Sequence, residues 1–534
     1  MRYLNWTAAV SILVCALGCG ERDKRLEASV NVVDVETLGG DLAYVQSSGT
    51  LQRINVMSDD PQPLTSQLTV RSGPRMLAKR PYTQGQQAID ELLIVSDGRS
   101  DSYGEVIDPP ALTVVSAAGD TRIYELNQSG QQMRLSDDGQ YAVLFNDPTR
   151  TTTDTLLTNR NEIAIVDLSH APSSSAPQDP IIRTIDAVGG APQGLFFANL
   201  KVGGQVIPFV LFSFPKGVSL TQLSDPTDPG HKVELAKWVP TIGSGFAPVQ
   251  DIRFDSDAGK IYLRNLRSPD VQVLSAAASV DAPGKVDVSQ NTLTVGQSAP
   301  TDFEVYSPSD GGTRLVATVG KSVAVVAADS NTVTTVPLSY TAENIYTFEG
   351  TSPKDNTSRR RALLYGTAQS GVSFVDLEDL EQKTTKAVQS VDLGANLASV
   401  LALPTLHNAL LIFLTGGGIE VLDLQTRRWS PIGSDVSITA SIADATLNRS
   451  WVTAPGDRRV GYLDFGDPSQ LSLSIGEVKV DDPVAKFFRL DAGTTKRVIV
   501  THNHVGGSLT FFDAVAPSRQ SAKKLEGFLL SGLL

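Results

Sequence analysis

A short phrase that ends in Asp recurs along this chain and constrains its fold more than any other feature. Clear copies end in Asp-Leu, and looser copies end in Asp-Phe or Asp-Ala. The copies occupy residues 162–168, 371–377, 418–424, 459–465 and 508–514. Where copies follow one another directly, they lie about 40 to 55 residues apart, a spacing typical of propeller blades. The phrase therefore predicts a repeat fold built from short strands.

A second pattern precedes the phrase in each repeat. Two apolar runs flank a turn rich in Asp, Asn and Gly, as in residues 134–145, where Asp138-Gly139 separates the runs. Asp-Gly is a strong hairpin signal because both residues tolerate positive φ. The same pattern covers residues 253–263, 445–452 and 489–500, and a polar outer strand is expected over residues 332–338. The predicted unit is a four-stranded antiparallel blade, and closing such blades into a ring leaves no large exposed sheet edge.

The repeats allow more than one number of blades. Third strands are expected near residues 50, 111, 162, 217, 270, 321, 371, 418, 459 and 507. This raw count of about ten exceeds the roughly four to eight blades of ordinary propellers. We therefore favour one all-β ring of seven or eight blades, with the copies at 218–223 and 271–274 as the least regular. A larger ring and two smaller propellers are the alternatives.

The C-terminal residues 526–534 are mostly apolar. Ring closure needs the two chain ends close together, so this tail is expected either to add a strand to the first blade or to form a small packing helix.

The repeats also carry a resemblance. Val166-Asp167-Leu168 and the turn at residues 136–139 are similar to the bacterial propeller repeats called YVTN or WD-repeat-like, over about residues 36–520. The Trp-Asp dipeptide of that family is absent. The resemblance implies a β-propeller and does not specify a function, because one fold hosts many functions.

The N-terminal segment predicts that the protein is exported and attached to a membrane. A positive charge at Arg2 and an apolar run over residues 7–18 indicate a secretory signal that is too short to span a membrane. Ala16-Leu17-Gly18-Cys19 resembles the lipobox of bacterial lipoproteins, although Ala16 stands where those families usually carry Leu. The resemblance implies that residues 1–18 are removed and that Cys19 is acylated. An ordinary secretory signal ending near a cysteine is the alternative.

The residue after Cys19 indicates which membrane the lipoprotein would be anchored in. Gly20 stands where lipoproteins retained in the inner membrane of many Gram-negative bacteria carry Asp, so the resemblance favours the outer membrane of the cell envelope. Residues 19–35 are expected to hold the lipidated cysteine and a flexible tether, and residues 36–534 the propeller.

Charge and cysteine content exclude several functions. The net charge of −13 argues against nucleic-acid binding, which requires clustered Lys and Arg. The basic run Arg359–Arg361 is interpreted as a solvated loop. Cys15 and Cys19 are the two cysteines of the chain, so zinc-thiolate sites and cysteine nucleophiles are excluded from its body.

Two sets of polar residues are candidate sites. The first comprises the aspartates that end the repeated phrase: Asp167, Asp376, Asp423, Asp464 and Asp513. They could gather around the axis to bind a cation or a sugar, but a residue repeated in every blade is better explained as holding a turn by accepting backbone N–H groups.

The second set is His502 and His504, which would face the same way on a strand and bind a metal together with Asp491 or Asp513. A histidine-containing surface loop is the alternative.

The remaining segments point to binding rather than chemistry. The acidic stretches 97–105 and 224–230 carry oxygen ligands suited to Ca²⁺ but lack the spacing of a calcium loop, so we interpret them as solvated turns. The Thr-rich residues 149–158 are expected to form a rim loop. No nucleophile elbow, P-loop, dinucleotide fingerprint or zinc-protease helix is convincing.

We therefore expect a lipid-anchored module that binds a protein or glycan partner without a cofactor. A hydrolase or lactonase-type propeller with a metal at the central channel is the alternative, and a purely structural component of the envelope is a third possibility.

Overall fold

The computed structural model describes residues 32–529, apart from a set of short gaps. These gaps are residues 59–61, 64–66, 85–86, 148–158, 169–179, 185–191, 215–216, 224–231, 236–248, 282–285, 309–310, 352–357, 381–386, 404–408, 425–426, 434–437, 445, 466–472, 493–494 and 505.

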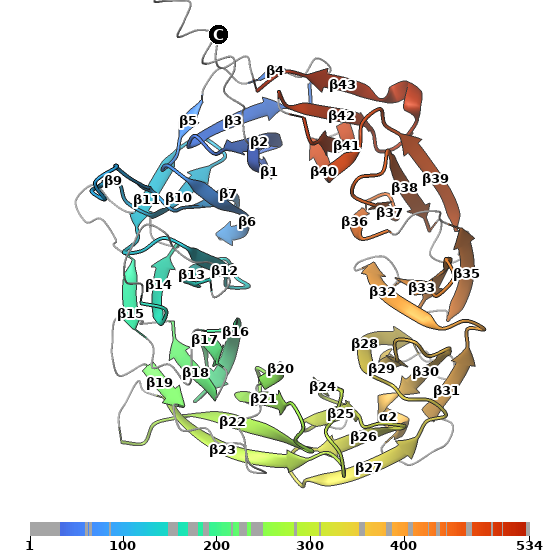
Figure 1. The fold of residues 1–534 in the computed structure, drawn as a ribbon. Coiled ribbons are helices and arrows are strands. Elements are labelled where there is room, and N and C mark those ends of the chain that lie inside the picture. The colour runs from blue at the N-terminus through green and yellow to red at the C-terminus, as the bar shows by residue number, and fades with distance from the viewer. Residues whose placement is uncertain are drawn as a thin grey trace, which may run out of the picture.

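The described chain is an all-β propeller of ten blades arranged in a ring (Figure 1). Each blade is an antiparallel sheet whose four main strands pair in chain order from the axis outward. The propeller prediction is confirmed. The preferred count of seven or eight blades is wrong, and the raw count of about ten repeats is right. The two least regular copies, at 218–223 and 271–274, both form third strands.

The first strand of each blade borders the axis (Figure 1). These strands are β1 (Val32–Leu38), β6 (Pro74–Gln84), β12 (Gln131–Leu135), β16 (Gly194–Val202), β20 (Val249–Asp255), β24 (Asp302–Tyr306), β28 (Asn344–Thr351), β32 (Leu397–Leu403), β36 (Ala440–Asp444) and β40 (Val484–Ala492). Because successive strands are antiparallel, each second strand ends on the side of the ring where each first strand begins. We call this side the entry face and the other side the hairpin face.

The second strands follow after tight turns. They are β2 (Asp41–Gln46), β7 (Gln87–Ser96), β13 (Tyr141–Asn146), β17 (Gln205–Phe214), β21 (Lys260–Asn265), β25 (Arg314–Thr318), β29 (Ser358–Tyr365), β33 (Ala409–Leu414), β37 (Arg449–Thr453) and β41 (Thr495–His502). Gly139, in the turn predicted from Asp138-Gly139, has φ +68°, as that turn requires.

The third strands begin at or within one residue of all ten predicted positions. They are β3 (Thr50–Asn55), β10 (Ala111–Ser116), β14 (Glu162–Asp167), β18 (Gly217–Gln222), β22 (Asp270–Ala278), β26 (Ser322–Ala327), β30 (Gly371–Asp376), β34 (Gly418–Asp423), β38 (Arg459–Asp464) and β42 (Ser508–Asp513). The repeated phrase is therefore the third strand of a blade.

The fourth strands form the outer wall. They are β4 (Gln62–Pro63), β11 (Thr121–Glu125), β15 (Ile181–Thr184), β19 (Lys232–Leu235), β23 (Val286–Thr294), β27 (Thr332–Pro337), β31 (Val388–Asp392), β35 (Arg428–Gly433), β39 (Ser474–Lys479) and β43 (Lys523–Glu526). A short strand, β5 (Leu68–Thr69), also pairs with β3, while β8 (Arg99–Ser100) and β9 (Val106–Asp108) form a separate hairpin. Within the described ranges, the helical segments are α2 (Leu377–Leu380) and η3 (Arg519–Ser521).

The core lies between blades. Among the described residues, buried apolar side chains form ten clusters, and each cluster joins two neighbouring blades. Alternate residues of one second strand enter opposite clusters, so Leu42 and Tyr44 face the tenth blade while Ala43 and Val45 face the second. Because both faces are buried, these strands are continuous apolar runs rather than alternating ones.

The ring closes by packing rather than by strand exchange. β43 pairs with β42 inside the tenth blade, and the described residues that follow it, 527–529, form no strand in the first blade. Phe528 and Leu529 instead enter the cluster between the tenth and first blades. The side-chain amide of Gln52 donates to the Phe528 carbonyl at 3.2 Å. The tail beyond residue 529 lies outside the described residues.

Candidate functional site

The repeated aspartates do not converge on a common site. Each is the last residue of a third strand, so the five are spread over five blades and stand two strands away from the axis. Asp513 accepts the backbone N–H of Val515 at 2.6 Å, and Asp376 accepts that of Asp379 at 3.3 Å at the start of α2. Asp464 pairs instead with Arg449 of the adjacent strand at 2.5 Å. These contacts serve single blades.

The two histidines of the pair lie in different environments, since His502 is buried and His504 is exposed. His502 is 7% exposed, and its Nδ1 lies 2.9 Å from the Pro483 carbonyl, which can only accept a hydrogen bond. Nδ1 therefore carries the proton, and Nε2 accepts from the Thr510 hydroxyl at 2.8 Å. Both ring nitrogens of His502 are engaged. His504 is exposed on the loop that follows, where its Nδ1 accepts the Gly506 N–H at 3.2 Å.

The proposed third metal ligands lie elsewhere. Asp513 pairs in register with Arg497, and Asp491 with Lys496, both near the opposite end of β41 from His502. Along β41, His502 lies five residues from Arg497 and six from Lys496, a separation of about 17 to 20 Å. In the described part of the chain, no group of three or more His, Cys, Asp or Glu side chains is arranged to hold a metal ion.

The basic run Arg359–Arg361 is not a solvated loop. It lies in the second strand β29, and Arg361 is among the most deeply buried side chains of the described chain. Arg359 contacts Asp379 at 3.3 Å, and Arg360 contacts Glu349 at the same distance. The loop interpretation failed because the acidic partners lie on other elements, Asp379 on α2 and Glu349 on β28.

The blade-2 hairpin, residues 97–110, is inserted between the second strand β7 and the third strand β10 and therefore emerges at the entry face. Its turn is organised by Asp101, whose Oδ1 accepts the N–H groups of Tyr103 at 2.9 Å and Glu105 at 2.8 Å. The stretch interpreted as a solvated acidic turn thus uses a carboxylate to hold its own backbone.

The base of the hairpin is fixed to the blade by ionic contacts. Arg71 bridges Asp108 at 2.5 Å and Glu125 at 2.7 Å, and Asp108 also accepts the Ser72 N–H at 2.7 Å. Burial alone would raise the pKa of Asp108, but the hydrogen bonds from Ser72 and Arg71 together lower it. Gly98 has φ +75°, and a Cβ there would lie 2.2 Å from the Asp108 carbonyl oxygen.

The tip of the hairpin carries large side chains that are exposed to solvent. Tyr103 is 92% exposed, Val106 63% and Ile107 54%. Exposed apolar residues grouped on an ordered protrusion indicate an interaction surface, whereas single ones do not. The sequence signal that could have found this surface is the pair Val106-Ile107 beside a tight turn.

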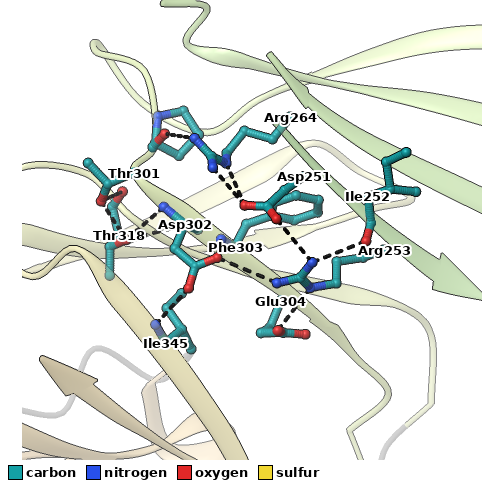
Figure 2. Close-up of polar contacts among 11 residues, drawn as sticks. Asp251, Ile252, Arg253, Arg264, Thr301, Asp302, Phe303, Glu304, Thr318 and Ile345 are labelled. Atoms are coloured by element: carbon teal, nitrogen blue, oxygen red, sulfur yellow. Dashed lines mark hydrogen bonds and ion pairs between the residues drawn. The ribbon is translucent and has the colours of Figure 1, made fainter. Parts of the chain in front are cut away.

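A charged network joins the fifth, sixth and seventh blades (Figure 2). Arg253 of β20 lies among three carboxylates, with Glu304 at 2.9 Å, Asp251 at 3.4 Å and Asp302 at 3.6 Å. Arg264 of β21 contacts Asp251 at 2.6 Å. These contacts connect the first strands of the fifth and sixth blades.

The network extends to the seventh blade through Asp302. Its Oδ2 accepts the Ile345 N–H of β28 at 2.8 Å (Figure 2). Burial raises the pKa of Asp302 and of Glu304, while Arg253 opposes both shifts. The network therefore holds three blades together with side chains that the sequence scatters over separate repeats, and sequence reasoning did not identify it.

Some sequence candidates cannot be placed. Cys19, the Thr-rich residues 149–158 and the acidic residues 224–230 lie outside the described residues. Within the residues that the structure does describe, no helix is both long and apolar enough to cross a bilayer.

Comparisons with known proteins assign the chain to no family. No protein-family model matches the chain, and no curated protein matches it. Dihydro-heme d1 dehydrogenase NirN in complex with DHE shares 10% identity, with 85% of this chain and 76% of that chain covered and a TM-score of 0.37. Apo AztD from Citrobacter koseri shares 12% identity, with 74% and 96% covered and a TM-score of 0.31. Sqt1 from Saccharomyces cerevisiae shares 10% identity, with 91% and 97% covered and a TM-score of 0.33.

Likenesses this distant bear on no function. The strand pairing of the chain itself establishes a β-propeller of ten four-stranded blades.

Proposed function

We propose that this chain is a lipid-anchored binding module of the bacterial envelope and that the blade-2 hairpin docks a protein partner. The observation that carries the proposal is an ordered hairpin with an exposed apolar tip. Tyr103 and Ile107 project from a base held by Arg71, so little conformational entropy is lost when a partner covers them. Tyrosine is also enriched among the residues that dominate binding energy.

A protein fits this surface better than a glycan does. The tip combines one aromatic side chain with two aliphatic ones, Val106 and Ile107, which offer no hydrogen bonds to sugar hydroxyls. Protein interfaces have a central apolar patch with a polar rim, and Arg99 and Glu105 flank the tip as such a rim would.

The location of the anchor narrows the class of partner. β1 begins at the entry face, the face from which the blade-2 hairpin emerges. An acylated Cys19 would reach Val32 through 12 intervening residues, which span at most about 40 Å. The hairpin would then face the membrane, and its partner would be a protein embedded in or bound to that membrane.

The test is crosslinking from the hairpin tip in intact cells. A photoreactive phenylalanine analogue replaces Tyr103 in one variant and Val280 in the control, which is 93% exposed after the third strand β22 and thus on the hairpin face. We expect a discrete protein adduct from position 103 and none from position 280. The same adduct from both positions, or lipid adducts alone from position 103, would overturn the proposal.

The specificity of the adduct is tested with a second substitution. Ile107→Ser in the position-103 variant removes apolar surface without touching the base of the hairpin, and we expect the adduct yield to fall at least several-fold. An unchanged yield would show that the apolar tip does not make the contact.

A further inference from the structure

A cavity of about 330 Å³ lies between the eighth and ninth blades. Its described walls come from the end of β35, from the end of β37 and the loop after it, and from β38 and β39. Ile475 and Glu477 of the outermost strand β39 are exposed, Ile475 by 57%, so the cavity opens on the outer wall of the ring. Pockets of this size accommodate small organic molecules.

The cavity exists because the ninth blade departs from the repeat at Gly461, the third residue of its third strand. At that place each of the other nine blades carries a residue larger than glycine. The tenth blade carries Thr510 there, and the two positions are equivalent because Gly461 pairs with Val452 and Thr510 with Val500 of the respective second strands. The ninth blade therefore lacks a side chain at a position that faces the preceding blade.

A second small residue enlarges the same space. Two residues after the paired valines, the ninth blade has Ala454 where the tenth blade has His502. In the tenth blade His502 is buried, and its Nε2 accepts from the Thr510 hydroxyl at 2.8 Å. Gly461 and Ala454 both line the cavity, which thus occupies the place that Thr510 and His502 fill one blade further on.

The inner part of the cavity is apolar. Ile432 of β35 and Ile438, which precedes β36, line it on one side, and Val452 and Leu463 of the ninth blade line it on the other. Transferring hydrocarbon from water to such a surface is favourable by about 25 cal/mol for each Å² buried. The cavity therefore selects a ligand with an apolar body.

The charged side chains at the cavity determine which polar group that body can carry. Arg459 and Asp457 neutralise each other, because Nε and Nη2 of the arginine donate to the two carboxylate oxygens at 2.8 and 2.7 Å. Glu477 contacts Lys479 at 3.7 Å, with both side chains about half exposed or more. Exposed pairs of this kind contribute little, so the Glu477 carboxylate can exchange its partner at low cost. The mouth therefore favours a cation.

We propose that this cavity binds a small amine whose apolar body packs against Ile432 and Val452 and whose ammonium group pairs with Glu477. An anion of the same shape would be repelled by Glu477, and a neutral analogue would gain only the apolar contacts. The site is independent of the blade-2 hairpin and of the anchor.

The test uses three fluorinated compounds of similar shape on the full-length chain carrying Cys19→Ser. They are 4-fluorobenzylamine, which is a cation at neutral pH, 4-fluorobenzyl alcohol, which is neutral, and 4-fluorobenzoate, which is an anion. Dissociation constants come from ¹⁹F NMR titrations. We expect the amine to bind about fivefold more tightly than the alcohol, the size expected for a half-exposed ion pair, and benzoate to bind least. Added salt should narrow the preference for the amine.

Glu477→Gln is the variant that tests the ion pair, because it removes the charge and keeps the shape of an exposed side chain. We expect it to abolish the preference for the amine and to leave alcohol binding unchanged. Glu526→Gln is the matched control, since Glu526 lies exposed on the outermost strand of the tenth blade and has its own lysine partner, Lys524. It should leave the preference intact.

The double variant Gly461→Thr with Ala454→His tests the cavity by giving the ninth blade the side chains of the tenth. We expect it to weaken binding of all three compounds at least several-fold. If it does not fold, the exposed Glu477→Gln still decides the question. Equal affinities for amine and alcohol in the parent chain, no binding of either, or a preference that survives Glu477→Gln would overturn the proposal. Unchanged binding by the folded double variant would do the same.

Discussion

Tyr44 and Phe528 meet edge to face, with ring centroids 4.9 Å apart and an interplanar angle of 64°, and so join the first blade to the end of the tenth. The contact is part of the cluster that closes the ring. Leu529 supports it, because its N–H donates to the Gly506 carbonyl at 3.0 Å. A ring with ten interfaces depends on each one, since opening any of them exposes two apolar faces.

The first prediction concerns this closure. Phe528→Ala should lower the free energy of unfolding by about 3 kcal/mol, because it removes a buried aromatic ring and leaves a cavity. Deleting residues 522–534 should cost more, since β43 is lost as well. Urea unfolding followed by tryptophan fluorescence measures both. Phe528→Leu is the control and should cost less than Phe528→Ala. An unfolding midpoint unchanged by the deletion would show that the tail does not close the ring.

The second prediction concerns the network around Arg253. Burial raises the pKa of Asp302 and Glu304, so the folded chain holds their protons more tightly than the unfolded chain does. Their contribution to stability is therefore fully present below the unfolded pKa values and declines as pH rises through the folded ones. Arg253→Gln removes the cation that opposes these shifts, so the decline should become steeper and extend to higher pH.

The expected size follows from leaving buried carboxylates without their partner. Arg253→Gln should lower the free energy of unfolding by about 3 kcal/mol at neutral pH and by clearly less near pH 4.5. Urea midpoints across that range measure the difference. Arg134→Gln is the control, because Arg134 lies exposed on the first strand β12 outside the network. A penalty for Arg253→Gln that does not change with pH would contradict the assignment.

The third prediction compares two glycines of the blade-2 hairpin. Gly98 and Gly104 have φ of +75° and +85°, so alanine is strained at either position by about 1 kcal/mol. A Cβ at Gly98 also collides with the Asp108 carbonyl, whereas none of the surrounding atoms lies within 4 Å of a Cβ at Gly104. Gly98→Ala should therefore release the hairpin and reduce the Tyr103 crosslink strongly, while Gly104→Ala reduces it little. Limited proteolysis at the hairpin reports the same difference.

The fourth prediction concerns the anchor. Metabolic labelling with a fatty-acid analogue should mark the full-length chain and be lost in Cys19→Ser. The same variant should move from the membrane fraction to the soluble fraction, because each buried acyl methylene contributes about 0.8 kcal/mol to membrane binding. Cys15→Ser, which lies within the expected signal, should keep the label. Persistent labelling of Cys19→Ser would refute the lipobox resemblance.

The sequence predicted the repeating unit well because that unit is local. Third strands such as Gly418–Asp423 carry their own apolar run and terminal Asp, so they are visible one at a time. Relationships between blades are not visible in this way. Arg361 was assigned to a loop because its environment is built by other strands, and the network of Arg253 with Glu304 joins residues of different repeats. Tyr44 and His502 likewise line one cavity only because the ring closes, so their proximity was beyond prediction for the same reason.

The two-sided burial of the second strands has a consequence for how such rings change over evolutionary time. Leu42 and Ala43 face different neighbours, and the same arrangement recurs around the ring, so every blade presents one apolar face to each side. Duplicating a whole blade would therefore insert a unit that fits between any two others and leaves no apolar face uncovered. Losing a whole blade would likewise bring together two apolar faces that can cover each other. The number of blades can therefore change by whole units without a new type of contact. A partial duplication would leave an apolar surface uncovered, and selection would remove it.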